Sequence, residues 1–465
     1  MSWTRLLFLL LLAGCMTVGP DYQRPQIELP AQYPESVPAS APAVAPQWWK
    51  LYGDATLDAL VASGQKTNAD VRLAAARVQE AEAALREARA TLFPEVTGSY
   101  AYARQRVSTA ASPPIPAGVP ISRSNHTLSA STNFELDFWG RFARASEAAR
   151  ANLFGARYAS DVVQISLAGA IAQGYFALRS LDAQLAVLDN TIRVRRDSLE
   201  IAQARLDAGL ASELDLHQAR GALADAAAQK REAERSRALV EHQLGQLSGR
   251  LDVKLVAADL FALPLAPVPP AGLPSELLER RPDIRQAEET LVAANAQIGV
   301  ARAALFPTIS LTASAGAQST ELSNLLTSGA GIWSLGFGLA LPLFDAGRRA
   351  ARVDQARARS EQAVAGYQRA VETGFREVAD ALVNVEQSGE SEAELKQRLD
   401  ATRAALELST LRYEKGYSPY LEVLDAQRTA NDAELAFVRN RQARLAFSVD
   451  LMKALGGGWN AGEAK

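Results

Sequence analysis

Acidic and basic side chains follow one another near the C-terminus, where Arg412 is followed by Glu422, Asp425 and Arg428. Glu422 and Asp425 are three residues apart, so on a helix both carboxylates lie on one face. Their chemistry is charge pairing rather than catalysis. With Arg428 three residues further on, they fit i,i+3 ion pairs, which contribute only tenths of a kcal/mol on a solvated helix. The residues alone therefore favour an ordinary charged helix surface.

Residues suited to catalysis are scarce. The only histidines are His126, His217 and His242, and they are not at the spacing of metal ligands. The sequence contains no nucleophile motif and no phosphate-binding loop. The net charge of −3 argues against a nucleic-acid binder. We therefore expect no enzyme, no cofactor, no metal site and no nucleic-acid partner.

The single cysteine, Cys15, follows a short apolar run. Arg5 precedes the apolar residues 6–12, and two small residues stand immediately before the cysteine. This pattern resembles a bacterial lipobox, which implies that residues 1–14 are a signal peptide and that Cys15 is acylated in the mature protein. A buried free cysteine is the alternative, but the position is the one expected for cleavage.

C-terminal to Cys15, prolines recur every four or five positions, which is too often for a helix or a central strand. We expect residues 15–52 to form an extended strap. Trp48 and Trp49 close this segment, and we expect them to dock on the folded body.

One heptad pattern occurs twice in the chain. Large apolar residues repeat every seven positions with alanines at the other seam position, first at Val71, Val78, Leu85 and Leu92 with Ala74, Ala81 and Ala88, and again at Ile284, Leu291, Ile298 and Leu305 with Ala287, Ala294 and Ala301. Such a pattern is typical of closely packed coiled-coil helices. Both copies end alike, as ARATLFP at 88–94 and ARAALFP at 301–307, and we expect Pro94 and Pro307 to end the helices.

Residues behind each proline alternate as in strands. One face is apolar and the other small or polar, which fits a barrel with lipid outside and water inside, although strands of a soluble sandwich alternate equally. The long polar connections 108–125 and 319–331 favour the barrel. We expect hairpins at about 95–138 and 308–344, with aromatic side chains at the membrane interfaces at Tyr100, Tyr102, Trp139 and Trp333.

A long helical hairpin follows each pair of strands. Residues 142–207 contain no proline and would extend about 100 Å as one helix. Gly209 and Gly416 stand at equivalent positions of the two copies and suit the left-handed turn after a helix. The chain thus divides into a first repeat (53–249), an equatorial linker (250–275), a second repeat (276–456) and a flexible tail (457–465).

Four strands per chain are too few for a closed barrel, because about eight strands are the small end. Several copies must contribute, and three would supply twelve strands in a closed symmetric assembly. We therefore predict an α+β membrane protein with a two-copy internal repeat, in which a trimeric 12-stranded β-barrel is continued by a long α-helical barrel with a mixed equatorial region.

Taken together, these features resemble the TolC-type outer-membrane efflux family and its OprM-like lipoprotein branch. The matching residues are Cys15 with Val18-Gly-Pro-Asp-Tyr22 and Arg24-Pro25, the Trp48-Trp49 pair, both LFP motifs, and the segment from Tyr413 to Leu424-Asp-Ala-Gln-Arg428. The resemblance covers nearly the whole mature chain. It implies a homotrimer in the Gram-negative outer membrane, anchored by lipid and extending into the periplasm, that serves as a passive exit duct for drugs or other small toxic compounds.

The resemblance also implies a gate at the periplasmic tip. In a trimer the two acidic positions would place six carboxylates around a narrow opening, and the basic and aromatic positions would hold the inner helices closed by charge-assisted bonds. Ser418 stands where TolC has an arginine, so the closing contacts must use the OprM-like arginines or be weaker. The gate residues are then Glu422, Asp425, Arg428, Arg412 and Tyr413.

The implied partners are a periplasmic adaptor (membrane fusion) protein and an inner-membrane RND-type transporter. The adaptor would contact the turns of the long hairpins, at Gly209, Ala211, Ser212, Gly416, Ser418 and Pro419. Two alternatives remain within the same class: the duct of a protein secretion system, and a duct for metal ions.

Overall fold

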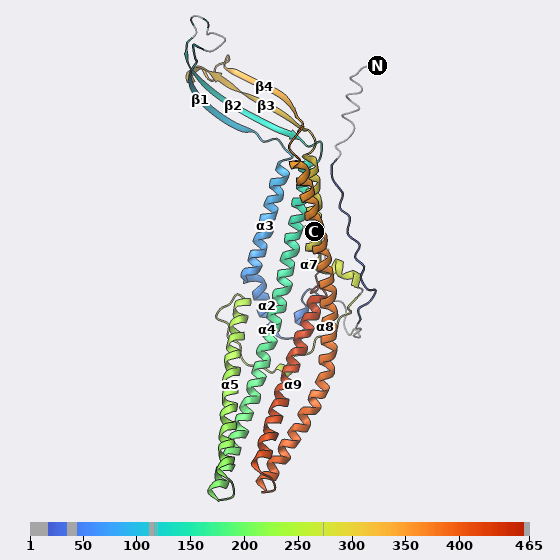
Figure 1. Ribbon diagram of the computed structural model, residues 1–465. Helices are drawn as coiled ribbons and strands as arrows, with labels where there is room; N and C mark the ends of the chain where they lie inside the picture. Colours follow the sequence, from blue (N-terminus) through green and yellow to red (C-terminus); the bar gives the residue numbers. More distant parts are fainter. Residues whose placement is uncertain are drawn as a thin grey trace. The chain divides into compact units, whose positions relative to one another are not determined.

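A computed structural model describes residues 17–34, 44–110, 116, 118, 120–272 and 274–459. The chain forms two compact units, and Figure 1 labels the strands and the longer helices. Unit 1 contains Met1–Gln26, Val78–Gly155 and Ala287–Tyr367, and unit 2 contains Ile27–Arg77, Ala156–Gln286 and Gln368–Lys465. The expected signal peptide, 1–14, and the expected lipidation site, Cys15, lie outside the described residues.

The second half of the chain has the same order and lengths of main helices as the first. The pairs are α3 (Ala69–Ala90) and α7 (Pro282–Ala303) with 22 residues each, α4 (Arg141–Asp207) and α8 (Arg348–Glu414) with 67, and α5 (Glu213–Leu247) and α9 (Tyr420–Ala454) with 35. The strands are β1 (Thr97–Arg106), β2 (Ser122–Leu136), β3 (Thr308–Ser319) and β4 (Gly331–Ala340). The shorter helices are η1 (Trp48–Tyr52), α2 (Ala55–Thr67), η2 (Leu260–Ala262), η3 (Pro274–Glu276), α6 (Leu277–Arg280) and η4 (Leu322–Asn324).

Unit 1 contains one antiparallel sheet in the order β1-β2-β3-β4, which confirms the prediction of four strands per chain (Figure 1). Residues that pair across strands share a face, and one face is mostly apolar from the Leu136–Ile309 pair to the Tyr100–Leu128 pair. The other face is small and polar. Pairs of serine hydroxyls lie on it, Ser99 with Ser129 at 3.1 Å and Ser314 with Ser334 at 2.8 Å. β2 begins at Ser122, inside the connection expected at 108–125, because its polar outer end still pairs with β1.

α3 buries the predicted heptad seam, with Ala74 and Leu85 buried and the positions between them half-buried. α7 buries the equivalent seam and further residues as well, among them Glu288 and Gly299. Two neighbours in unit 1 explain the difference. The N-terminal strap contacts α7, for example through Arg24 and Glu288. α4 packs on α7 through the alanines Ala148 and Ala151 of α4 and Ala293 and Ala296 of α7.

The strap is fixed to α7 at several points. Arg24 donates two hydrogen bonds to Glu288, Nε to Oε1 at 2.6 Å and Nη2 to Oε2 at 2.9 Å, and the Tyr22 hydroxyl donates to the same carboxylate at 3.0 Å. Gly19, with φ of 121°, lies so close to Gly299 that a Cβ on Gly19 would be 2.5 Å from the Gly299 Cα. The VGPDYxRP segment is therefore the part of the strap that is fixed to α7.

Both LFP motifs end their helices in the same way, but earlier than expected. α3 ends at Ala90 and α7 at Ala303, and short turns follow before each proline, with Phe93 N bonded to Ala90 O at 3.0 Å and Phe306 N to Ala303 O at 3.1 Å. Trp139 stacks on Phe306 with ring centroids 4.7 Å apart and donates to the Pro307 carbonyl at 2.7 Å. The structure thus places Trp139 at the junction of α7 and β3.

Unit 2 holds a large hydrophobic core. Trp48 and Trp49 are 1% and 7% exposed and belong to it, which confirms that they dock on the folded body. Residues 457–459, expected in a flexible tail, are held in place, since Trp459 donates to Asp161 at 2.9 Å. Among the described helices only α4 is long and apolar enough to cross a membrane by composition, and 44% of its most apolar window is buried in the protein.

Candidate functional site

The turns of the two long hairpins, which lie side by side in unit 2 (Figure 1), have the same backbone. Gly209 and Gly416 have φ of 71° and 80°, as expected for the left-handed position after a helix. Each turn is closed by the hydrogen-bond pair of a Schellman motif, with Leu210 N to Arg205 O at 2.7 Å and Tyr417 N to Arg412 O at 2.8 Å as the longer links.

The side chains at the two turns differ in burial and capping. Ser212 begins α5 with a reciprocal capping box, whereas Pro419 begins α9 without a side-chain cap. Ser418 is buried, which separates it from the exposed positions expected to contact an adaptor; Ala211 is half-buried, and the exposed ones are Gly209, Ser212, Gly416 and Pro419.

Sequence reasoning missed four exposed apolar side chains at these turns. They occupy equivalent places in the two hairpins and are Leu210 (70% exposed), Leu214 (63%), Tyr417 (78%) and Leu421 (59%). The equivalence of the two copies was the available signal, because apolar residues at matching positions on a polar turn are unusual. We treat these four side chains as a candidate contact surface.

The predicted gate residues form contacts inside one chain. Arg412 of α8 pairs with Glu422 of α9, Nε to Oε1 at 3.0 Å, and ties the two helices of the hairpin together. Arg428 pairs with Asp425 three residues away on α9 at 2.8 Å. Both residues of the second pair are exposed, so it is worth tenths of a kcal/mol.

Tyr413, the fifth gate residue, is buried between the hairpins. Its ring lies 5.5 Å from that of Tyr420, and the Arg205 guanidinium of α4 stacks over it at 4.7 Å and donates to its carbonyl at 2.8 Å. Burial raises the pKa of Tyr413, and burial raises that of Tyr420 to about 12, with the neighbouring Tyr413 adding to the shift. Tyr413 thus connects α8 to α4 of the same chain.

Above the turns, side-chain hydrogen bonds connect α4 to α9. Gln427 donates to Ser198 at 2.8 Å, and Thr191 donates to Asn431 at 2.9 Å. The Oε1 atom of Gln427 is buried and has no hydrogen-bond partner in the described part of the chain. These polar contacts lie beside an apolar cluster that also joins the two hairpins, with Ala202 of α4 packed near Tyr413, Tyr420 and Val423.

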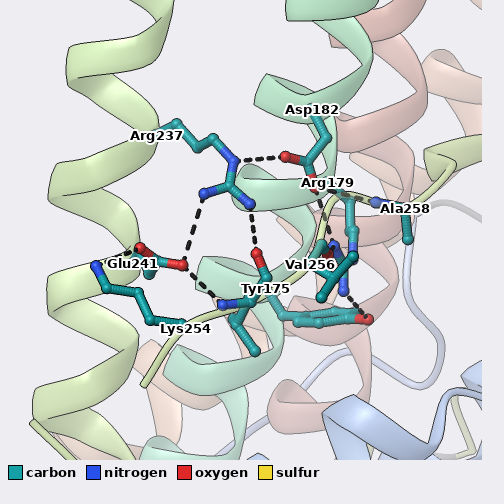
Figure 2. A network of polar contacts seen from close by, with 9 residues as sticks. Tyr175, Arg179, Asp182, Arg237, Glu241, Lys254, Val256 and Ala258 are labelled. Atoms are coloured by element: carbon teal, nitrogen blue, oxygen red, sulfur yellow. Dashed lines mark hydrogen bonds and ion pairs between the residues drawn. The ribbon is translucent and has the colours of Figure 1, made fainter. Parts of the chain in front are cut away.

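A buried charge network holds the linker against the first hairpin. Figure 2 shows Asp182 and Arg179 of α4 beside Arg237 and Glu241 of α5. Asp182 accepts from Arg179 at 2.9 Å and from Arg237 at 2.6 Å. The same four side chains bind the linker backbone, through Arg179 to Val256 O, Asp182 to Ala258 N, Arg237 to Leu255 O and Glu241 to Leu255 N.

Hydrogen bonds within this network offset the effect of burial on the Glu241 carboxyl. Burial by itself raises the pKa of Glu241, but hydrogen bonds from the Leu255 amide and the Lys254 ammonium leave the pKa below its ordinary value. Each carboxylate meets cationic donors and each cation meets a carboxylate or carbonyl. The linker, expected only as a connection, is therefore a fixed part of the first hairpin.

No group of three or more potential metal ligands occurs among the residues that the structure describes. The arrangement offers charge pairs, aromatic contacts and turns, which can position helices and contact partners.

The chain is similar to known proteins along nearly its whole length. A family model described as outer membrane efflux protein matches residues 60–250 and 273–457. The solvent efflux pump outer membrane protein SrpC of Pseudomonas putida is 35% identical over 470 residues, covering 98% of each chain. The cation efflux system protein CusC of Escherichia coli O6:H1 is 34% identical over 460 residues, covering 97% of each chain. The solved open state of the MtrE outer membrane channel of Neisseria gonorrhoeae has a TM-score of 0.86 and 30% identity, covering 95% of this chain and 98% of that one.

Proposed function

The chain belongs to the outer membrane efflux protein family, and we propose that it is the outer-membrane channel of a tripartite efflux pump, a passive exit duct for drugs or other small toxic compounds. Members of this family are channels and not enzymes. A relative named for cation efflux keeps metal ions as a second candidate cargo. The observation that carries the proposal is the open sheet with one apolar face.

The sheet needs partners at both edges. β1 and β4 are its edge strands, and apolar side chains of β4 are widely exposed, Trp333 by 81%, Leu335 by 68% and Phe337 by 69%. A long apolar edge strand left unpaired would be an aggregation site. Three copies joined edge to edge give a 12-stranded barrel, with the apolar face towards lipid and the serine face towards a water-filled lumen.

The helices of unit 1 offer a matching contact between copies. α3 exposes Ala83 and Ala90, and α8 exposes Ala351, Ala358 and Ala365, in each helix seven residues apart. Small residues at heptad spacing let helices pack closely. We infer that α3 of one copy packs on α8 of the next, which closes the helical barrel in the periplasm. Acylation of Cys15 would anchor each chain in the outer membrane.

The contacts around the second turn support a gate at the tip. The Arg412–Glu422 pair and the Tyr413 packing hold α8 and α9 to each other and to α4, and the carboxylates of Glu422 and Asp425 would surround the opening of the trimer. The exposed apolar turn residues, beside Gly209 and Gly416, are the proposed docking points for a periplasmic adaptor that links the duct to an inner-membrane RND-type transporter. Adaptor binding would favour the open state of the tip.

Single-channel conductance in planar bilayers tests this proposal. The variant Glu422→Ala with Asp425→Ala is compared with a control, Glu232→Ala with Glu234→Ala, which removes the same charge from i,i+3 pairs on α5. We expect small cation-selective steps for the wild type and the control, and steps at least about twofold larger with weaker cation preference for the tip variant. Unchanged conductance and selectivity would refute the gate, and a wild type without any steps would refute the barrel.

A further inference from the structure

A row of aromatic side chains ends the apolar face of the sheet at its outer end. Tyr102 of β1 pairs with His126 of β2, with ring centroids 4.7 Å apart, and the Tyr100 hydroxyl lies 2.9 Å from His126 Nδ1. Every second residue of a strand shares a face, so the next two side chains on this face of β1 are Arg104 and Arg106. Two arginines therefore follow the aromatic row on the face that we assign to lipid.

Strand geometry places these arginines beyond the hydrocarbon. The apolar face of β2 runs from Leu136 to His126, which at ~3.3 Å per residue and a tilt of ~40° spans about 25 Å along the membrane normal. The apolar band of a membrane barrel is also about 25 Å tall and is bordered by aromatic girdles. Arg104 and Arg106 then lie about 5 and 10 Å further out, at the level of lipid head groups.

The outer end of the first hairpin is positively charged. Residues 104–126 contain three arginines and no acidic residue, although the whole chain has a net charge of −3. Residues 319–331 contain one acidic residue, Glu321, and no basic one. Both Arg104 and Arg106 are exposed, and neither makes a hydrogen bond or ion pair with another residue in the described part of the hairpin. These cations are available to an anion outside the protein.

We propose that Arg104 and Arg106 bind the phosphate groups of a phosphorylated glycolipid of the lipid A type in the outer leaflet. The guanidinium fork fits phosphate oxygens in a bidentate manner, and the Tyr102 and His126 rings border the acyl region below. A lipid is the source of the phosphate because the face that carries both arginines is the one that meets the bilayer. The proposal rests on the barrel proposed above, and the trimer would carry three such sites.

Arg123 provides a matched control. It lies at the same height of the same hairpin, but it pairs with Gln105, between the two arginines, and so belongs to the opposite face of the sheet. Its guanidinium donates to the Pro120 carbonyl at 3.2 Å. Replacing Arg123 therefore removes a positive charge from the outer rim without touching the lipid-facing site.

The experiment titrates bisphosphorylated lipid A into the purified full chain in detergent and measures binding by native mass spectrometry. Arg104→Ala with Arg106→Ala should weaken binding about thirtyfold, the equivalent of about 2 kcal/mol, because each surface arginine contributes about 1 kcal/mol towards an anionic head group. Arg123→Ala should change binding less than twofold, within the spread of about ±0.5 kcal/mol for neutral surface changes.

Further arms separate the possible sources of a signal. Lipid A without phosphates should bind weakly to the wild type and equally to all variants, and inorganic phosphate should not compete at equal concentration. Equal loss in the Arg123 variant, unchanged binding in the double variant, or phosphatidylglycerol binding with the same arginine dependence would overturn the proposal. Conductance of the same samples keeps the two proposals apart, since a channel that conducts without arginine-dependent lipid binding refutes only the lipid site.

Discussion

The Asp182 carboxylate is the centre of the buried charge network between α4, α5 and the linker, and its removal tests what holds unit 2 together. Its side chain is 3% exposed and accepts from Arg179, Arg237 and the Ala258 amide. In Asp182→Ala the Arg179 side chain, 4% exposed, keeps its bonds to the Tyr175 hydroxyl and the Val256 carbonyl but loses its counter-charge. Removing one partner from a buried ion pair costs about 3–5 kcal/mol.

Denaturant unfolding in detergent, followed by circular dichroism, measures this cost, and hydrogen exchange of the 255–258 amides shows whether the linker is released first. Asp380→Ala is the control, because Asp380 also binds an arginine, Arg376, at 2.7 Å, but both side chains are more than half exposed, at 57% and 64%. The control should lose less than about 1 kcal/mol. Equal losses in the two variants, or normal protection of the linker in Asp182→Ala, would show that the network is not what fixes the linker.

Two further changes test the packing of the tip and of the strap. Burial raises the pKa of Tyr420 to about 12 from 10.0, so the contribution of its neutral form to stability is complete below pH 10 and is lost as the pH rises through 12. Melting curves should show Tyr420→Phe close to wild type at pH 7, since the hydroxyl has no partner among described residues. Between pH 10 and 12 the melting temperature of the variant should depend less on pH than that of the wild type. A Cβ on Gly299 would lie 2.7 Å from the Val18 carbonyl, so Gly299→Ala should expose residues 17–24 to proteolysis. Gly366→Ala is the control and should not, because a Cβ on Gly366 would have no neighbouring atom within 4 Å. Equal cleavage of the two variants would argue against the contact between strap and helix.

Local sequence rules were sufficient for the elements whose cause is local. Periodicity in the sequence predicted the heptad seam of α3 and the alternation of the strands, and the glycines after α4 and α8 predicted left-handed turns. The structure contains all of these features. The predicted ends of the helices were less accurate. Pro94 and Pro307 do end the helical region, but the turns before them are set by backbone hydrogen bonds that sequence spacing does not reveal.

Contacts between distant segments were not predictable in the same way. The binding of Glu288 by Tyr22 and Arg24, and of the linker backbone by Arg179 and Arg237, joins residues far apart in the chain, and nothing in their local sequence names the partner. The gate shows the same limit. The sequence placed Glu422 and Asp425 on one helix face, but only the fold shows that Glu422 pairs across the hairpin while Asp425 pairs within its own helix.

The turns of the two hairpins have the same backbone conformation but differ in how their polar atoms are hydrogen-bonded, and this difference bears on the proposed gate. The first turn has a complete capping box at Ser212. In the second hairpin, buried polar atoms without a partner among described residues gather around the turn, at Tyr413 Oη, Ser418 Oγ, Tyr420 Oη and Gln427 Oε1. Each such atom costs about 1–3 kcal/mol, and water could satisfy all of them if the hairpin moved outwards. Arg205 and the apolar cluster around Tyr413 and Tyr420 hold the second hairpin against α4, whereas the Arg412–Glu422 pair joins α8 to α9. We therefore propose that the second hairpin is the one that moves when the proposed gate opens.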